Sequence, residues 1–202
     1  MFPEEKNHRF KKNYRESLLQ KLDGSNPPDW DVIVIGGGIT GAGILREAAR
    51  RGYRTLLVEQ KDFAWGSSSR SSKMIHGGLR YLAAGNWKLT RESLIERERL
   101  LTEAPGLIER IDYYFTLIRG KFPGRWSFHL LLSLYDLFAG IKNHGFIKAS
   151  LFKKLFPGIA APKLTGAYRF SDAITNDARL VMRVIQEGIS DGGHALNYAH
   201  VE

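Results

Sequence analysis

Residues 31–41 read DVIVIGGGITG, and this stretch decides how the fold begins. Four apolar residues, 32–35, are typical of a short strand that is buried on both faces. The frame Gly36-x-Gly38-x-x-Gly41 follows directly, and the pattern then becomes helical as far as residue 51. This order of strand, glycine turn and helix favours a nucleotide-binding βα unit.

Each glycine of the frame meets a separate physical need. Gly36 permits the tight reversal, Gly38 lets a pyrophosphate approach bare backbone, and Gly41 allows the helix to pack close to the strand. The first helical residues, Ile39 and Thr40, offer free N–H groups and the positive end of the helix dipole to phosphates.

An acidic residue is expected about 20 positions further on, at the end of a second strand, to hold the adenosine ribose. Residues 55–58 supply that strand, and Glu59 ends it 23 residues after Gly36. An ordinary strand–turn–helix without a ligand is the alternative. The complete order of elements within about 30 residues favours a dinucleotide site.

Composition limits the remaining choices. The chain has 202 residues, 43% of them hydrophobic and 25% charged, as in a globular protein. With no cysteine it has no disulfide or thiolate site, and the spacing of its six histidines predicts no metal site. The net charge of +9 favours anionic partners. The N-terminus lacks the apolar core of a secretory signal, and no apolar run is long enough to span a membrane.

The rest of the chain reads as a mixture of helices and strands. We expect helices over residues 4–22, 86–104, 126–141 and 177–191, the last capped by Asp177, and strands over 112–118, 165–171 and from 195 to the end. Residues 23–30 read as a linker because they are rich in Gly, Ser, Asn and Pro. Because the chain ends as a new strand begins, we expect it to be part of a longer protein.

Four segments carry a more specific resemblance: GGGITGAG (36–43), VEQKDF (58–63), GSSSRSSKMIHGGLRYL (66–82) and SDAITNDARLV (171–181). Together they resemble the FAD-dependent, quinone-linked glycerol-3-phosphate dehydrogenases over about residues 30–202. The serine-rich loop into HGGLRY and the NDARL segment are far more specific than the glycine frame alone.

This resemblance implies an α/β fold, a glutathione-reductase-type Rossmann FAD-binding domain, here incomplete, with part of an inserted substrate domain. Residues 1–24 would form a basic, helical arm and 25–110 the first part of the FAD-binding domain. Residues 111–175 would be an excursion with substrate-domain and membrane-facing elements, and 176–202 a return to the FAD-binding domain. The reaction would be oxidation of sn-glycerol 3-phosphate to dihydroxyacetone phosphate by hydride transfer to FAD. We expect the 202 residues alone to be inactive.

The site residues follow from the frame and the resemblance together. The serine hydroxyls suit phosphates or the flavin edge, although a solvated serine loop is the alternative. By resemblance, Lys73 and His76 lie at the flavin ring, and His76 is also the candidate catalytic residue. The expected cofactor-binding set is Gly36, Gly38, Ile39, Thr40, Gly41, Glu59, Gln60, Ser67, Ser68, Ser71, Ser72, Lys73, His76 and Gly77.

Arg80 and Tyr81 are the candidate substrate-binding residues. A guanidinium binds phosphate oxygens in pairs, and the family's matching Arg-Tyr pair contacts the substrate phosphate. A surface salt bridge is the alternative for Arg80. For Arg179 we expect a structural ion pair with Asp177, or a cap, rather than substrate contact.

A basic, aromatic stretch predicts further partners. Residues 119–163 contain eight Lys or Arg and one acid, Asp136, around a strongly apolar helix. This suits an interfacial helix on anionic lipid, and a core helix with solvated basic loops is the alternative. We expect a cytoplasmic protein, peripheral on the inner face of the cell membrane, with a membrane quinone as acceptor. A homodimer is allowed, and no module for nucleic acid is present. A glycerol-3-phosphate oxidase and a truncated, non-catalytic FAD-binding module remain alternatives.

Overall fold

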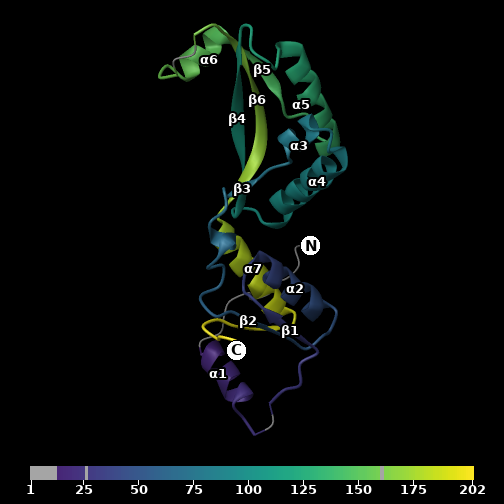
Figure 1. Cartoon of the computed structure of the whole chain (residues 1–202), viewed down its shortest axis with the longest axis vertical. Coiled ribbons are helices and arrows are strands. Elements are labelled where there is room, and N and C mark those ends of the chain that lie inside the picture. Colours follow the sequence, from purple (N-terminus) through teal and green to yellow (C-terminus); the bar gives the residue numbers. More distant parts are fainter. Residues whose placement is uncertain (1–12, 26, 160–161) are drawn as a thin grey trace, which may run out of the picture. The chain divides into compact units, whose positions relative to one another are not determined.

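The computed structural model describes residues 13–25, 27–159 and 162–202. Contacts divide the chain into two compact units (Figure 1). The first contains the residues up to Lys73 together with Asn176–Glu202, and the second is Met74–Thr175. The chain therefore leaves the first unit, builds the second and returns.

The first unit is a parallel sheet with helices on both faces. Its strands β1 (Val32–Ile35), β2 (Thr55–Val58) and β7 (His194–Leu196) lie in the order β1-β2-β7. Helices α2 (Ile39–Arg50) and α7 (Asp177–Ser190) cover one face, and α1 (Tyr14–Leu22) packs on the other. This arrangement agrees with the predicted Rossmann-type α/β class.

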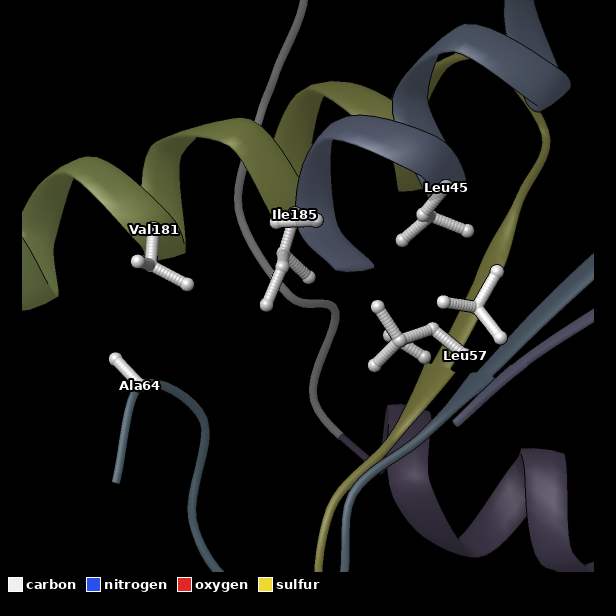
Figure 2. Packing of buried hydrophobic residues seen from close by; sticks show 8 residues of the cluster. Leu45, Leu57, Ala64, Val181 and Ile185 are labelled. Atoms are coloured by element: carbon white, nitrogen blue, oxygen red, sulfur yellow. The ribbon is translucent and has the colours of Figure 1, made fainter. Parts of the chain in front are cut away.

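The main core of the first unit lies between the sheet and helices α2 and α7. Figure 2 shows Leu45 and Ile185 of the two helices near Leu57 of β2, and Val181 of α7 above Ala64 of the following loop. Since successive strand residues face opposite sides, Leu56 and Val58 lie in the second cluster, under α1. A strand buried on both faces explains the continuous apolar run of β2.

The second unit is an antiparallel sheet. Strand β6 (Leu164–Thr175) pairs along its length with β4 (Ile108–Ile118), and it also pairs with β3 (Met74–Ile75) and β5 (Gly145–Lys148). Helix α5 (Arg125–Ala139) packs on one face, with α3 (Leu79–Ala83) and α4 (Trp87–Glu103) beside it (Figure 1). Helix α6 (Ala149–Leu155) contacts Tyr114 of β4, whereas the next residue, Phe115, stacks on α5.

The structure corrects several sequence expectations. The strand expected from residue 195 to the end stops at Leu196, because Tyr198 adopts a left-handed backbone with φ 50°. Residues 74–110, expected with the FAD-binding part, pack in the second unit, since β3 pairs with β6 and α4 packs on α5. Strands β3 and β5, helix α6 and a 3₁₀ turn, η1 (Ser67–Ser69), were not predicted. Part of the helix expected over residues 4–22 lies outside the described residues.

Candidate functional site

The glycine turn between β1 and α2 has the close approaches that its spacing predicts. Gly36 has φ +111°, a conformation that side chains rarely adopt. A Cβ on Gly41 would lie 1.9 Å from the Gly36 carbonyl oxygen, so only glycine allows α2 to start against the strand. A Cβ on Gly38 would lie 3.0 Å from the Ser68 hydroxyl. The turn therefore presents bare backbone, which fits a pyrophosphate.

Glu59 ends β2 beside this turn. Its Oε2 accepts a hydrogen bond from the Gly37 N–H at 2.8 Å, and its Oε1 accepts one from the Lys61 N–H at 2.8 Å. The carboxylate is thus held at the glycine turn by backbone donors, and each oxygen keeps a further lone pair for a ribose hydroxyl.

The serine loop meets the same turn through Ser68. The Ile39 N–H, at the start of α2, donates to the Ser68 hydroxyl at 2.9 Å. The hydroxyl still has its own proton to donate, so a polar group stands at the positive end of α2. Gly36, Gly38, Ile39, Glu59 and Ser68 are therefore brought together by the fold.

The end of the serine loop is tied to α7 by Asp177. Its carboxylate accepts from the Ser71 hydroxyl at 2.8 Å, from the Ser71 N–H at 3.1 Å and from the Lys73 ammonium at 2.9 Å. The hydrogen bond from Lys73 is the largest cause that holds the pKa of Asp177 well below its usual range, with the Ser71 donors adding to it against the effect of burial. Lys73 itself has φ +60°.

Two expectations about this segment are wrong. The N-cap of α7 is Asn176, whose side chain accepts from the Arg179 N–H at 3.1 Å, and not Asp177. Asp177 pairs with Lys73 and not with Arg179, because its side chain turns toward the serine loop.

In the second unit, a buried polar network holds the HGG segment. The Gly77 N–H, the Tyr135 hydroxyl and the Arg97 guanidinium all donate to one oxygen of Asp172, at 3.1, 2.8 and 2.6 Å. A Cβ on Gly77 would lie 2.1 Å from the Leu94 side chain, so this backbone packs where only glycine fits. Burial, and then the charge of Asp172, raise the pKa of Tyr135, which keeps its hydroxyl a donor.

The candidate substrate residues follow that segment on α3. His76, Arg80 and Tyr81 are exposed, and the rings of His76 and Tyr81 lie 6.2 Å apart. Within residues 13–25, 27–159 and 162–202, no carboxylate pairs with Arg80. The salt-bridge alternative for Arg80 thus finds no partner in the described chain. Gln60, Ser67 and Ser72 are exposed, and Thr40 is exposed at the start of α2.

Sequence reasoning missed the supporting carboxylates and cations. Asp172 and Asp177 hold the two loops that carry most of the candidate residues, and Arg97 lies in the interior with 1% exposure. The segment SDAITNDARLV contains both aspartates, but from sequence Asp177 was expected only as a helix cap or a partner of Arg179, and Asp172 was given no role. The signal that could have found them was a polar residue that interrupts an apolar pattern, within a predicted strand or at a predicted helix start.

A family model described as "FAD dependent oxidoreductase" matches residues 31–202, which is most of the chain. The chain belongs to this family. Membership of this family confirms two predictions from sequence, that the cofactor is FAD and that the protein is of the oxidoreductase class.

Curated relatives of this family member carry the name that the resemblance predicted. It is 37% identical over 199 residues to "Probable glycerol-3-phosphate dehydrogenase, mitochondrial" of Caenorhabditis elegans, covering 93% of this chain and 27% of the relative. It is 42% identical over 164 residues to "Glycerol-3-phosphate dehydrogenase 2" of Mycobacterium bovis, covering 77% and 27%. "Aerobic glycerol-3-phosphate dehydrogenase" of Staphylococcus haemolyticus is 36% identical over 187 residues, covering 91% and 33%. The chain thus spans about a quarter to a third of these relatives.

Solved structures agree with the fold. The glycerol-3-phosphate dehydrogenase of Bacillus halodurans, complexed with FAD, matches with a TM-score of 0.64 and 27% identity over 96% of this chain and 31% of that one. The L-proline dehydrogenase of P. horikoshii matches with a TM-score of 0.63 and 20% identity over 88% and 46%. The second likeness supports the fold alone.

Proposed function

We propose that this protein oxidises sn-glycerol 3-phosphate to dihydroxyacetone phosphate as a FAD-dependent dehydrogenase. The observation that carries the proposal is the 36–42% identity to proteins named glycerol-3-phosphate dehydrogenase, over 77–93% of the chain. The residues matched by the family model, 31–202, include both the glycine turn and the HGGLRY segment. The quinone as electron acceptor is part of the proposal, and oxygen, as in an oxidase, is the alternative.

In this proposal the first unit holds the ADP half of FAD. The bare backbone of Gly36 and Gly38, the N-terminus of α2 and the Ser68 hydroxyl would hold the pyrophosphate. Glu59 would bind the adenosine ribose with the lone pairs that its backbone donors leave free. The remaining serine-loop residues and Lys73 would contact the flavin half of the cofactor.

The second unit supplies the groups for the substrate. Oxidation removes a hydride from C2 and a proton from the hydroxyl on that carbon. Bound FAD supplies the hydride-accepting chemistry. His76 is the exposed imidazole of the HGG segment, and we assign it the hydroxyl proton. Arg80, with no carboxylate partner in the described chain, binds the phosphate, and Tyr81 borders it.

Removing the Arg80 guanidinium tests the substrate assignment. A charge-assisted hydrogen bond is usually worth about 1.5–3 kcal/mol, so Arg80→Ala should lower kcat/KM for glycerol 3-phosphate by roughly 10- to 150-fold. The assay uses the protein expressed from its complete gene, with a dye acceptor, and then compares a quinone analogue with oxygen.

Two controls make this result specific. Arg91→Ala removes an exposed arginine from α4 of the same unit and should leave kcat/KM unchanged. Flavin content should stay near normal in Arg80→Ala, and slow oxidation of glycerol, which has no phosphate, should hardly respond. Normal efficiency with glycerol 3-phosphate in Arg80→Ala would contradict the phosphate assignment.

The outer face of α5 supports attachment to a membrane surface as part of this proposal. Trp126, Leu130 and Leu137 are 78%, 63% and 70% exposed, and their spacing places them on one stripe of the helix. Phe122, just before the helix, is 92% exposed. With the surrounding Lys and Arg residues, this stripe suits an anionic bilayer. Among the described residues, no helix has both the length and the apolar character needed to cross a bilayer.

Vesicle flotation tests this surface. The full-length protein should float with phosphatidylglycerol vesicles and much less with phosphatidylcholine vesicles. Leu130→Gln combined with Leu137→Gln should abolish flotation, whereas Leu89→Gln, an exposed leucine of α4, should leave it unchanged. Equal flotation of all variants would contradict the assignment of the α5 stripe.

A further inference from the structure

A basic pocket in the second unit lies outside all the residues assigned above to FAD and substrate. Its volume is about 470 Å³, and strands β5 and β6 and the loop that carries Lys142 and His144 meet there beside α5. Four basic side chains line it, Arg125, His129, Lys142 and His144, together with the Tyr168 phenol, and no carboxylate is among the lining residues. Within the described ranges, neither Arg125 nor Lys142 pairs with a carboxylate.

The pocket is built rather than incidental. The Arg125 guanidinium lies 4.0 Å from the centre of the Phe146 ring, which keeps its N–H edge available for an anion. The Tyr168 hydroxyl donates to the Arg125 carbonyl at 3.4 Å, and the Tyr168 ring stacks on His129 with centres 5.9 Å apart. Positions at the start of α5 also feel the positive end of its dipole.

Behind the pocket, a buried carboxylate orders two imidazoles. Asp136 Oδ2 accepts from the N–H groups of Asn143 and His144, at 2.7 and 3.1 Å, and lies 2.7 Å from His144 Nδ1. An oxygen held by these donors is an acceptor, so His144 Nδ1 carries the proton. The His144 side chain is only 8% exposed, which fixes this orientation.

The proton position on His144 in turn fixes which nitrogen of His129 carries a proton. His144 Nε2 lies 3.1 Å from His129 Nδ1. When both rings are neutral, His144 Nε2 accepts and His129 Nδ1 donates. The nitrogen that is left with a free lone pair is then His129 Nε2. A proton added at that atom makes His129 a cation beside Arg125 and Lys142. It repels those two charges unless an anion is present.

We infer that this pocket binds a tetrahedral oxyanion of the phosphate class, and that binding brings one proton to His129. Arg125 and Lys142 supply the fixed charges, and His129 becomes the third donor when the anion is bound. Asp136, through His144, positions the ring of His129. The groups that face His129 are Arg125 and Asp136 on its own helix, Lys142 and His144 on the following loop, and Tyr168 on β6.

Equilibrium dialysis with labelled inorganic phosphate tests the site. The protein from the complete gene carries Arg80→Ala, so the proposed substrate contact does not contribute. It should bind one equivalent of phosphate, and Arg125→Gln and Lys142→Gln should each weaken binding by roughly tenfold. Lys88→Gln, which changes an exposed lysine of α4 in the same unit, should have no effect on phosphate binding. Unchanged phosphate binding when Arg125→Gln and Lys142→Gln are combined, or no saturable phosphate binding at all, would overturn the inference.

The proton is tested with sulfate, which does not titrate in this range. Sulfate should bind several-fold tighter at about pH 6 than at about pH 8, because the protonated ring of His129 gives the anion one more donor. His129→Gln should bind equally at both values, and a merely structural role of His129 would leave the pH dependence in place. Retention of that dependence in His129→Gln would overturn the protonation step.

A last arm separates two sources of the anion. Phosphatidylglycerol vesicles should displace the labelled phosphate if a lipid headgroup is the natural occupant, and should not if a soluble phosphate ester is. Leu130→Gln with Leu137→Gln removes the two leucines of the apolar stripe and changes no residue of the pocket lining, so displacement that survives in this variant identifies the pocket itself. Either source supports the oxyanion site.

Discussion

The two units place their candidate residues by different physical means. In the first unit, the groups at the glycine turn are mainly backbone N–H and carbonyl groups, brought together by the tight turn at Gly36 and the close packing of Gly41 against it. In the second unit, the HGG segment is positioned by buried side chains, with Arg97 and Tyr135 donating to Asp172. The first arrangement depends on the absence of side chains, and the second on a charged pair in the interior.

This difference predicts different sensitivities. A backbone site tolerates changes of charge nearby but not the addition of a Cβ, because no atom can give way. A buried ion pair tolerates neither the loss of one partner nor a change of charge, since the remaining ion is left without compensation. Substitutions can therefore tell the two arrangements apart.

The largest effect should come from the buried pair. Arg97→Met leaves Asp172 buried without its cation and should lower the free energy of unfolding by about 3–5 kcal/mol, as measured by urea denaturation. Arg99→Met, two residues along the same helix, removes only exposed pairs with Glu96 and Glu103 and should cost less than about 1 kcal/mol. Equal losses in the two variants would show that the network does not hold the second unit.

A smaller effect should come from the glycine turn. In Gly41→Ala the new Cβ meets the Gly36 carbonyl oxygen at 1.9 Å, so α2 must shift, at a cost of about 1–3 kcal/mol. FAD content, read from flavin absorbance, should fall with it. Gly43→Ala adds the same atom two residues later, where nothing lies within 4 Å, and should stabilise α2 by roughly 0.5–1 kcal/mol. Normal FAD content in Gly41→Ala would argue against a pyrophosphate at this turn.

The smallest effect concerns acid stability of the serine loop. The folded-state pKa of Asp177 lies below its ordinary value of about 3.9, first because of Lys73. Its contribution to stability is therefore complete above about pH 4 and is lost as the pH falls toward the folded-state pKa. Urea denaturation between about pH 5 and about pH 2.5 should show a shallower acid loss in Asp177→Asn than in the unchanged protein.

The partner variant sharpens that measurement. Lys73→Gln removes the ammonium, and its acid loss should also be shallower. Combining it with Asp177→Asn should add little, because the two residues contribute through one contact. If the two substitutions lowered the free energy of unfolding independently and additively, the serine loop would not be held by this pair.

The expectations from sequence were most accurate where few residues decide the outcome. β1, α2, β2 and Glu59 follow one another within residues 31–59, and each depends on neighbours in the chain. The helices α4, α5 and α7 were also placed within a few residues, because their apolar faces repeat with the helical period. Strand β4 was predicted too short, since its polar half, Glu109 to Asp112, pairs with β6 without an alternating pattern.

The sequence by itself determined the βα unit and the class of ligand that this unit binds. Glycine spacing, strand length and helix start are local properties, and a left-handed φ at Gly36 can be expected from the residue type alone.

Only the tertiary structure decided which polar side chains meet. The Arg97–Asp172 contact joins residues 75 positions apart, and the Ser71–Asp177 contact joins residues 106 apart. No local pattern specifies such pairs. Arg97 and Asp172 meet when α4 and β6 come together in the second unit, where their attraction offsets the cost of burying both charges. Ser71 and Asp177 meet only after the chain has returned to the first unit through α7.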